Sequence, residues 1–185
     1  MTKRIMILAT DGFEQSELMA PKANLEDAGF ETTVVSLKEG EIRGWDQKDW
    51  GKSVKVDKTV DEVSDCSGYD ALLLPGGQMN PDILRMSDRA IAIVREFNMA
   101  GKPIAAICHA PWLLAEADII KDRTVTSWPS IRTDLANAGA RVVDEEVTID
   151  GNLITSRKPD DIPAFSKALI GMLGETVEKR EMETA

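Results

Sequence analysis

Residues 103–112 read PIAAICHAPW, a run of small apolar side chains that ends on Cys108. A short run of this kind predicts a strand buried on both faces, as in a parallel sheet that helices cover on each side. The next residue, His109, is the only histidine in the chain. The segment therefore raises one question: whether Cys108 is a core thiol, or a nucleophile that a sharp strand-to-helix turn presents.

Further apolar, β-branched runs on both sides of this segment alternate with helical patterns. The predicted strands cover residues 4–9, 31–37, 69–77, 103–107, 124–128 and 141–156, the last being strands joined by a turn at 150–152. The predicted helices cover residues 11–29, 81–100, 109–117 and 131–139, and a last one carries Ile162, Phe165, Leu169 and Met172 at core-facing spacing. Residues 41–57 fit this alternation poorly, and we expect a small β-excursion with exposed tryptophans there.

The alternation of strands and helices indicates the fold class. It predicts one α/β domain over residues 1–185, a sandwich in which helices cover both faces of a mostly parallel sheet. This length suits a single core of ordinary size. Residues 175–185 are polar, and we expect them to form a frayed tail.

Composition and charge limit the partners and the location of the protein. The net charge is −10 and the 22 basic residues are scattered, which argues against nucleic acid, because such surfaces need clustered Lys and Arg. The apolar run at 5–9 is too short for a signal peptide and no segment reaches the length of a membrane span, so we expect a soluble cytoplasmic protein. With one histidine and two distant cysteines, Cys66 and Cys108, neither a metal site nor a bound cofactor is expected.

Three unusual segments follow predicted strands directly. They are TDGFEQSE at 10–17, PGGQMNPD at 75–82 and CHAPW at 108–112. In open α/β sheets, ligands bind beyond the carboxyl ends of the strands. We therefore expect these segments to meet at one edge of the sheet and to form the functional site.

Cys108 and His109 each allow two interpretations. A cysteine at a strand-to-helix turn lies beside helix N–H groups that lower the thiol pKa and favour the thiolate, the form that attacks an electrophilic carbon. A free cysteine is also among the residues most often buried without a function, and we assign this simpler role to Cys66. His109 is the only candidate for a histidine base, and a structural histidine that caps the turn is its alternative.

The other two segments contribute paired acids and paired glycines. Glu14 and Glu17 lie three apart in the predicted first turn of a helix, where acids commonly complement the helix dipole. If one of them reaches Cys108, a carboxylate raises the thiol pKa, whereas a protonated carboxyl donates a hydrogen bond that lowers it. Gly76 and Gly77 are either simple turn residues or a means of bringing a backbone N–H group to the nucleophile as half of an oxyanion site.

Taken together, five segments resemble the DJ-one/ThiJ/PfpI superfamily, and most closely its PfpI-like intracellular protease and general stress protein branch. The segments are ATDGFEQSEL (9–18), YDALLLPGGQMNPDILR (69–85), GKPIAAICHAPWLL (101–114), TSWPSIRTDLANAGA (126–140) and IDGNLITSRKPDDIPAF (149–165). The resemblance extends from residue 3 to about residue 173. It implies a flavodoxin-like three-layer sandwich of the class I glutamine amidotransferase type, with a nucleophile elbow.

The resemblance also implies a role for each candidate residue on the cysteine side of the site. Cys108 would be the reactive cysteine, and Glu17 would form a hydrogen bond with its sulfur. Glu14 would line the pocket. Gly77, preceded by Gly76, would supply a backbone N–H group to an oxyanion site.

On the histidine side, the resemblance implies a contribution from a second subunit. His109 would supply the other oxyanion N–H group, and in PfpI-like proteins an acid of a neighbouring subunit orients the imidazole. The matching acid here is Asp82, in a loop that is one residue longer than in some relatives. A homodimer or a larger homo-oligomer is therefore expected.

Two classes of function follow from these residues and from the resemblance. The first is a cysteine-dependent stress-response hydrolase or lyase that acts on the carbonyl group of a small aldehyde or a peptide, as a peptidase, a glyoxalase-like enzyme or a deglycase. The second is a non-catalytic redox sensor or chaperone-like protein that uses oxidation of Cys108. Fold and family alone do not choose between them.

Overall fold

The computed structural model describes the backbone of residues 2–183 and the side chains of residues 2–174. Its centre is a seven-stranded sheet of order β11-β12-β8-β7-β1-β3-β6, in which every neighbouring pair is parallel except the hairpin β11-β12. The strands are β1 (Arg4–Leu8), β3 (Glu31–Ser36), β6 (Lys58–Thr59), β7 (Ala71–Leu74), β8 (Ile104–Ile107), β11 (Val147–Asp150) and β12 (Leu153–Ser156). The predicted mostly parallel sheet is thus confirmed.

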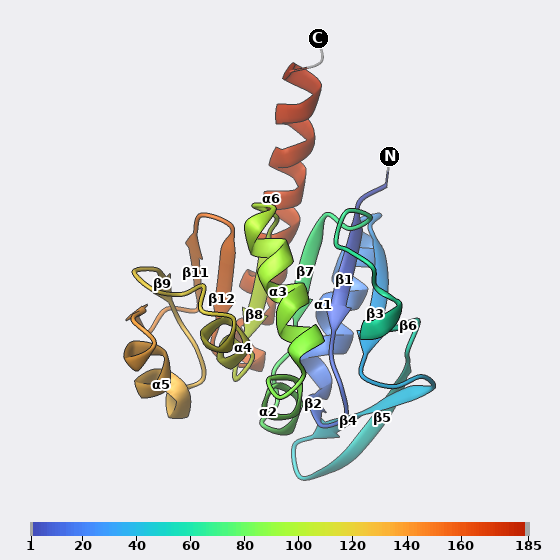
Figure 1. The fold of residues 1–185 in the computed structure, drawn as a ribbon, viewed down its shortest axis with the longest axis vertical. Helices are drawn as coiled ribbons and strands as arrows, with labels where there is room; N and C mark the ends of the chain where they lie inside the picture. The colour runs from blue at the N-terminus through green and yellow to red at the C-terminus, as the bar shows by residue number, and fades with distance from the viewer. Residues whose placement is uncertain (1, 184–185) are drawn as a thin grey trace.

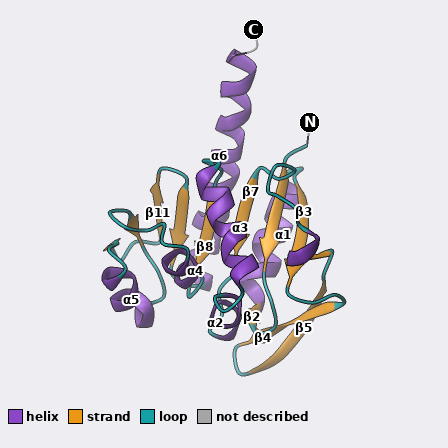
Figure 2. Ribbon diagram, viewed as in Figure 1, coloured by secondary structure: helices purple, strands orange, loops and turns teal. Residues whose placement is uncertain are grey.

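Helices cover both faces of this sheet and produce a three-layer sandwich (Figure 1, Figure 2). The helices are α1 (Gln15–Asp27), α2 (Met79–Leu84), α3 (Asp88–Met99), α4 (Pro111–Glu116), α5 (Arg132–Asn137) and α6 (Ile162–Glu183). Strand β1 shows the alternation that two buried faces require. Ile5 and Ile7 join the core under α1 and α6, whereas Met6 and Leu8 join the core under α3 and α4.

Two predicted helices have different boundaries in the structure. Residues 81–100 form two helices, α2 and α3, because Ser87 has an extended backbone and its Oγ accepts a hydrogen bond from Ala90 N–H at 3.3 Å, which starts a new helix. The helix predicted from residue 11 begins only at Gln15, because Phe13–Glu14 forms the short strand β2, which pairs with β4 (Glu41–Asp46).

Two predicted strand regions lie outside the main sheet. Strand β9 (Thr124–Val125) pairs with β10 (Arg141–Val142) in a separate two-stranded sheet. Residues 41–57 form the expected β-excursion, in which β4 and β5 (Asp49–Lys55) are an antiparallel hairpin. Trp50 is 40% exposed as expected, but Trp45 is only partly exposed, because its ring packs edge-on against the Trp50 ring at 5.6 Å.

The last helix is longer than the sequence pattern indicated. We expected a frayed tail from about residue 175, but α6 continues to Glu183. The added turns consist largely of Glu, Lys, Arg and Met, which are strong helix formers. Figure 1 shows the final turns of α6 extending beyond the other elements. Within the described residues, no helix is both long and apolar enough to cross a membrane.

Candidate active site

Cys108 directly follows β8 and has a left-handed backbone, with φ at 65°. This conformation is unfavourable for a residue that carries a Cβ, and it persists only where surrounding contacts impose it. The Cys108 N–H donates to Ser156 O at 3.0 Å, and the Cys108 carbonyl accepts from Trp128 N–H at 2.9 Å. The strand therefore ends in the sharp turn of a nucleophile elbow, as the sequence predicted.

The left-handed turn decides which face of the sheet receives the sulfur. Strand alternation would place the side chains of residues 107 and 108 on opposite faces. Ile107 and Cys108 instead belong to the same core, the one under α1 and α6. The Cys108 side chain consequently lies on the side of Glu17 and is 5% exposed.

Gly76 and Gly77 follow β7 and pack against this elbow. A Cβ on Gly76 would lie 2.4 Å from Glu17 Oε2 and 2.6 Å from both Cys108 Cβ and Ile107 O. Gly77 has φ at 85°, in the region that favours glycine. The double glycine is therefore required for the close approach of three chain segments, which is more than simple turn formation demands.

Glu17 is fully buried at 0% exposed. Its Oε2 accepts a hydrogen bond from Gly76 N–H at 3.0 Å, so this N–H group is not available to a substrate. Burial, and after it the charge of Glu14, raise the pKa of Glu17 to about 8, although the adjacent Cys108 side chain and the N–H groups of Gly76 and Gly77 act in the opposite direction. Glu17 is therefore protonated at neutral pH and can donate a hydrogen bond towards the sulfur.

Glu14 serves as the N-cap of α1. Its Oε2 accepts from Glu17 N–H at 2.9 Å and from the Ser16 hydroxyl. Glu14 therefore satisfies the amino end of α1, the simpler of the two roles considered for the paired acids. Its influence on the site is electrostatic, through the pKa of Glu17.

The thiol environment differs from the one expected for the elbow. Burial, and then the charge that Glu17 carries once it is ionised, raise the pKa of the Cys108 thiol above its usual range. The backbone N–H groups of Gly77 and His109, the pair expected to form an oxyanion site, lie against the sulfur and act in the opposite direction. Of the two directions that the sequence left open, burial favours the raised pKa, because desolvation outweighs these N–H groups.

The His109 side chain lies against this thiol and is 8% exposed. Its Nδ1 is 3.2 Å from Cys108 Sγ, and its Nε2 is 3.4 Å from Ser130 Oγ. Burial lowers the pKa of His109, so the imidazole is neutral at neutral pH. A neutral imidazole nitrogen at this distance can accept the thiol proton.

Two tryptophans enclose the imidazole ring. The Trp128 ring stacks on it, with centroids 5.8 Å apart and an interplanar angle of 22°, and the Trp112 ring meets it edge-on at 5.4 Å. Trp112 Nε1 in turn donates to Asp134 Oδ2 at 2.8 Å. Sequence reasoning missed both tryptophans and Ser130 as site residues, although Trp112 closes the CHAPW segment and the other two lie in TSWPS.

Asp82 does not join this site within one chain. It lies in α2, its side chain is exposed, and it forms no hydrogen bond or ion pair with the described residues. Its contact with His109 of a neighbouring copy stays a prediction. Cys66 is buried in the core under α3 and α4, and the described part of the chain contains no group of three side chains suited to a metal ion.

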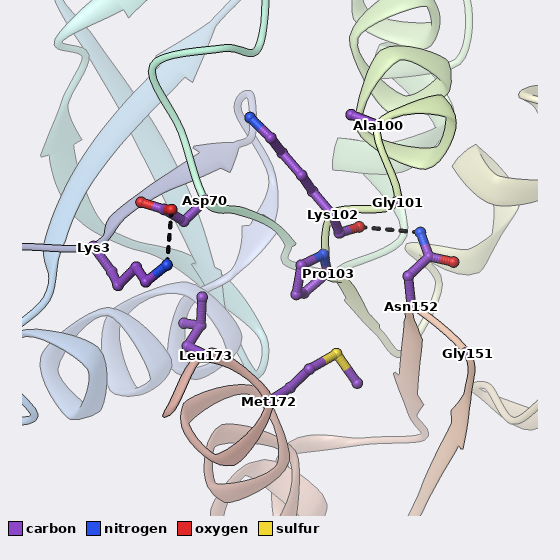
Figure 3. A pocket seen from close by; sticks show the side chains of 10 residues that line it. All are labelled: Lys3, Asp70, Ala100, Gly101, Lys102, Pro103, Gly151, Asn152, Met172 and Leu173. Carbon is purple, nitrogen blue, oxygen red and sulfur yellow. Dashed lines mark hydrogen bonds and ion pairs between the residues drawn. The ribbon is translucent and has the colours of Figure 1, made fainter. Parts of the chain in front are cut away.

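A separate cavity of about 270 Å³ lies near the amino ends of β1, β7, β8 and β12 (Figure 3), whereas Cys108 follows the carboxyl end of β8. Lys3 Nζ is paired with Asp70 Oδ1 at 3.1 Å on one side of it, and Asn152 Nδ2 donates to Lys102 O at 3.0 Å on the other. These polar groups satisfy one another. The cavity therefore does not compete with the elbow as the candidate active site.

The fold and the elbow define a class of protein, the α/β sandwiches that carry a cysteine at a strand-to-helix turn beside a buried glutamate. Residues 3–172 match the DJ-1/PfpI family, and the chain belongs to that family.

Two relatives are similar to this chain over almost their whole length, and a solved structure matches it over one part. Protein/nucleic acid deglycase 2 of Escherichia coli is 43% identical over 176 residues, which cover 94% of this chain and 99% of that protein. General stress protein 18 of Bacillus subtilis is 42% identical over 175 residues, with 94% and 99% covered. A solved protein of Anabaena variabilis with DJ-1/ThiJ/PfpI-like and ferritin-like domains matches with a TM-score of 0.88 and 36% identity over 94% of this chain, which spans 48% of that longer protein. The predicted fold class is thereby confirmed.

Proposed function

We propose that this chain is a cysteine-dependent deglycase, a hydrolase that removes an α-oxoaldehyde from an amino group to which it has added. The observation that carries the proposal is the Cys108 sulfur, placed beside His109 Nδ1 at 3.2 Å and beside Glu17, whose pKa is about 8. A thiol with a neutral base and a protonated carboxyl as neighbours has both proton carriers that carbonyl addition needs. The similarity to a protein named as a deglycase supports this choice.

The first steps use these two proton carriers in turn. The hydroxyl group of the adduct releases its proton to solvent, the C–N bond breaks to give the free aldehyde, and the amine leaves with a proton from Glu17. His109 Nδ1 takes the proton of Cys108, and the electron pair stays on sulfur. The thiolate then forms a C–S bond with the aldehyde carbon, and the carbonyl π electrons move to oxygen. The N–H groups of Gly77 and His109 are available to stabilise this oxyanion.

The remaining steps need no external oxidant. The Glu17 carboxylate removes the proton from the former aldehyde carbon, the electron pair moves to the neighbouring carbonyl oxygen, and that oxygen takes the proton held by His109, so that an enediolate forms. Glu17 then returns its proton to the neighbouring carbon, and the oxyanion becomes the carbonyl group of a thioester of an α-hydroxy acid. Water hydrolyses this thioester, which returns the Cys108 thiol and releases the acid, and Glu17 regains its proton from solvent. One carbon is oxidised and its neighbour is reduced, so the reaction balances with one water molecule consumed.

The burial of the site favours a small substrate group over a polypeptide backbone. Cys108 is 5% exposed and His109 is 8% exposed, so little of either side chain is open to solvent. A short aldehyde fragment at the end of a lysine or nucleobase adduct needs little room to reach the sulfur. A peptide bond within a folded chain needs a wider groove to reach the same atom, so we rank the peptidase activity lower.

The test compares the variants Cys108→Ala and Cys66→Ala. Each is incubated with N-acetyl-lysine that has been treated with methylglyoxal, and nuclear magnetic resonance follows the lactate and the free amine. We expect Cys66→Ala to retain turnover and Cys108→Ala to lose about 100-fold or more. Equal turnover in Cys108→Ala and the wild type contradicts the mechanism, and cleavage of fluorogenic peptides without lactate supports the peptidase instead.

A redox sensor at the same cysteine is the second candidate. The observation in its favour is the Glu17 carboxyl, whose pKa is about 8. It is therefore protonated at neutral pH and can donate a hydrogen bond to an oxygen atom added to the sulfur. The burial that raises the pKa of Cys108 acts against it, because peroxide attacks the thiolate. Intact-mass spectra after mild peroxide treatment decide: oxygen added at Cys108 supports the sensor, and an unchanged mass excludes it.

A further inference from the structure

The second nitrogen of the His109 ring has a partner that the proposed reaction does not use. Nδ1 faces Cys108 Sγ at 3.2 Å, and Nε2 faces the hydroxyl of Ser130 at 3.4 Å. An imidazole has two ring nitrogens, so these two contacts occupy its whole hydrogen-bonding capacity. Catalytic hydrogen bonds are often long before substrate binds and shorten afterwards, so the length of the second contact does not disqualify it.

We propose that Ser130 is a positioning residue that holds His109 in the orientation in which Nδ1 accepts the proton of Cys108. The inference rests on the proposed function only in taking Cys108 as the reacting group. Before transfer, Nδ1 accepts from the thiol and Nε2–H donates to Ser130 Oγ. Transfer breaks the S–H bond, forms the Nδ1–H bond and leaves the electron pair on sulfur. Ser130 accepts from Nε2–H in both states, so it does not need to move.

The segment that carries Ser130 is attached to the elbow itself. Ser130 lies in the 3-10 turn Pro129–Ile131, directly after Trp128. Trp128 N–H donates to Cys108 O at 2.9 Å, and the Trp128 ring stacks on the imidazole. Pro129 fixes one backbone dihedral between this anchor and the serine. The position of the hydroxyl is thus set by the same turn that encloses the ring.

The charged side chains near the site do not replace this hydroxyl. Among the described residues, none forms an ion pair with the imidazole. Glu17 faces the sulfur of Cys108. Asp134 Oδ2 accepts a hydrogen bond from Trp112 Nε1 at 2.8 Å, and the Arg85 guanidinium lies over the Trp112 ring, 5.4 Å from its centroid. Within one chain, the described groups that contact the His109 ring are therefore neutral, and Ser130 is the hydrogen-bond partner of its Nε2.

A second subunit would have to compete for the same nitrogen. Because Nδ1 of His109 faces Cys108, an acid from another copy, such as Asp82, can reach the ring only at Nε2. Ser130 of the same chain already faces that atom. An acid from another copy would therefore compete with Ser130 for Nε2, and variants of the two residues distinguish the two arrangements.

The experiment measures alkylation of Cys108 by iodoacetamide as a function of pH, in the full-length Cys66→Ala protein so that one thiol is read. For Ser130→Ala we expect the rate at neutral pH to fall about 3- to 10-fold, with the profile displaced to higher pH. Ser130→Thr retains a hydroxyl and should restore the parent profile. Ser130→Asp offers Nε2 a charged acceptor and should displace the profile to lower pH.

Each outcome supports or overturns the proposal. Ser130 is exposed, and thermal unfolding verifies that its variants fold like the parent. An unchanged profile in Ser130→Ala overturns the proposal, as does an equal displacement in the Ala and Thr variants. A displacement in Asp82→Asn alone assigns Nε2 to a neighbouring copy and also overturns it. Because alkylation needs no substrate, the result holds whether or not deglycase turnover is found.

Discussion

Glu17 links the chemistry of the site to the stability of the protein. An unfolded glutamate ionises near pH 4.3, whereas the folded carboxyl has a pKa of about 8. Between these values the folded state binds more protons than the unfolded state. The free energy of unfolding therefore falls as pH rises through this window, by at most about 1.4 kcal/mol per pH unit. The contribution of the protonated Glu17 carboxyl to stability is complete below about pH 4.3 and is lost above about pH 8.

The variant Glu17→Gln isolates this contribution, because glutamine does not ionise. We expect the wild type to lose stability relative to Glu17→Gln as pH rises from about 4.3 to about 8. Urea unfolding of both proteins at a series of pH values measures the difference. Curves that stay parallel across the window would show that the Glu17 carboxyl ionises normally in the folded protein.

The site residues that could be predicted from sequence are those that directly follow a strand of the main sheet. Cys108 and His109 follow β8, and Gly77 follows β7, so parallel topology alone brings them to one edge. Ser130 follows β9, which lies in a separate sheet, and its approach to His109 depends on tertiary packing. The direction of the thiol pKa was not predictable either, because it depends on how deeply the folded protein buries the sulfur.

At the scale of elements, the long apolar strands were predictable and the short ones were not. β1 and β8 are continuous buried runs, which leave little alternative to a parallel strand. Strands β2, β9 and β10 have only two residues each, too few to show a period, and neighbours in the fold determine them. The break between α2 and α3 is likewise local, since one serine cap replaces a continuous helix.

Helix α6 provides a test of an element that can be changed without touching the site. Gly171 lies in this helix, is exposed, and a Cβ added there would meet no atom within 4 Å. Gly171→Ala should therefore raise the free energy of unfolding by about 0.5–1 kcal/mol, because alanine loses less backbone entropy in a helix. Urea unfolding measures this gain, and turnover should not change. A loss of stability would mean that this position makes contacts outside the single chain.

At the scale of the whole molecule, the open question is whether one chain holds a complete site. We expect a homodimer or a larger homo-oligomer, which light scattering measures. A mixture of Cys108→Ala and Asp82→Asn chains then tests whether the subunits complete one another's sites. With Ser130 on the imidazole, we expect the mixture to show the average of the two separate activities. Activity above this average would place Asp82 of one copy in the site of another.

The two cores of the molecule also separate its two cysteines. Cys66 lies before β7 in the core under α3 and α4, whereas Cys108 lies after β8 in the core under α1 and α6. The sheet thus stands between the two sulfurs, and they are at its opposite ends. A disulfide between them would require a large backbone movement. If Cys108 is oxidised to a sulfenic acid, the resolving thiol must therefore come from another molecule, such as a free thiol in solution.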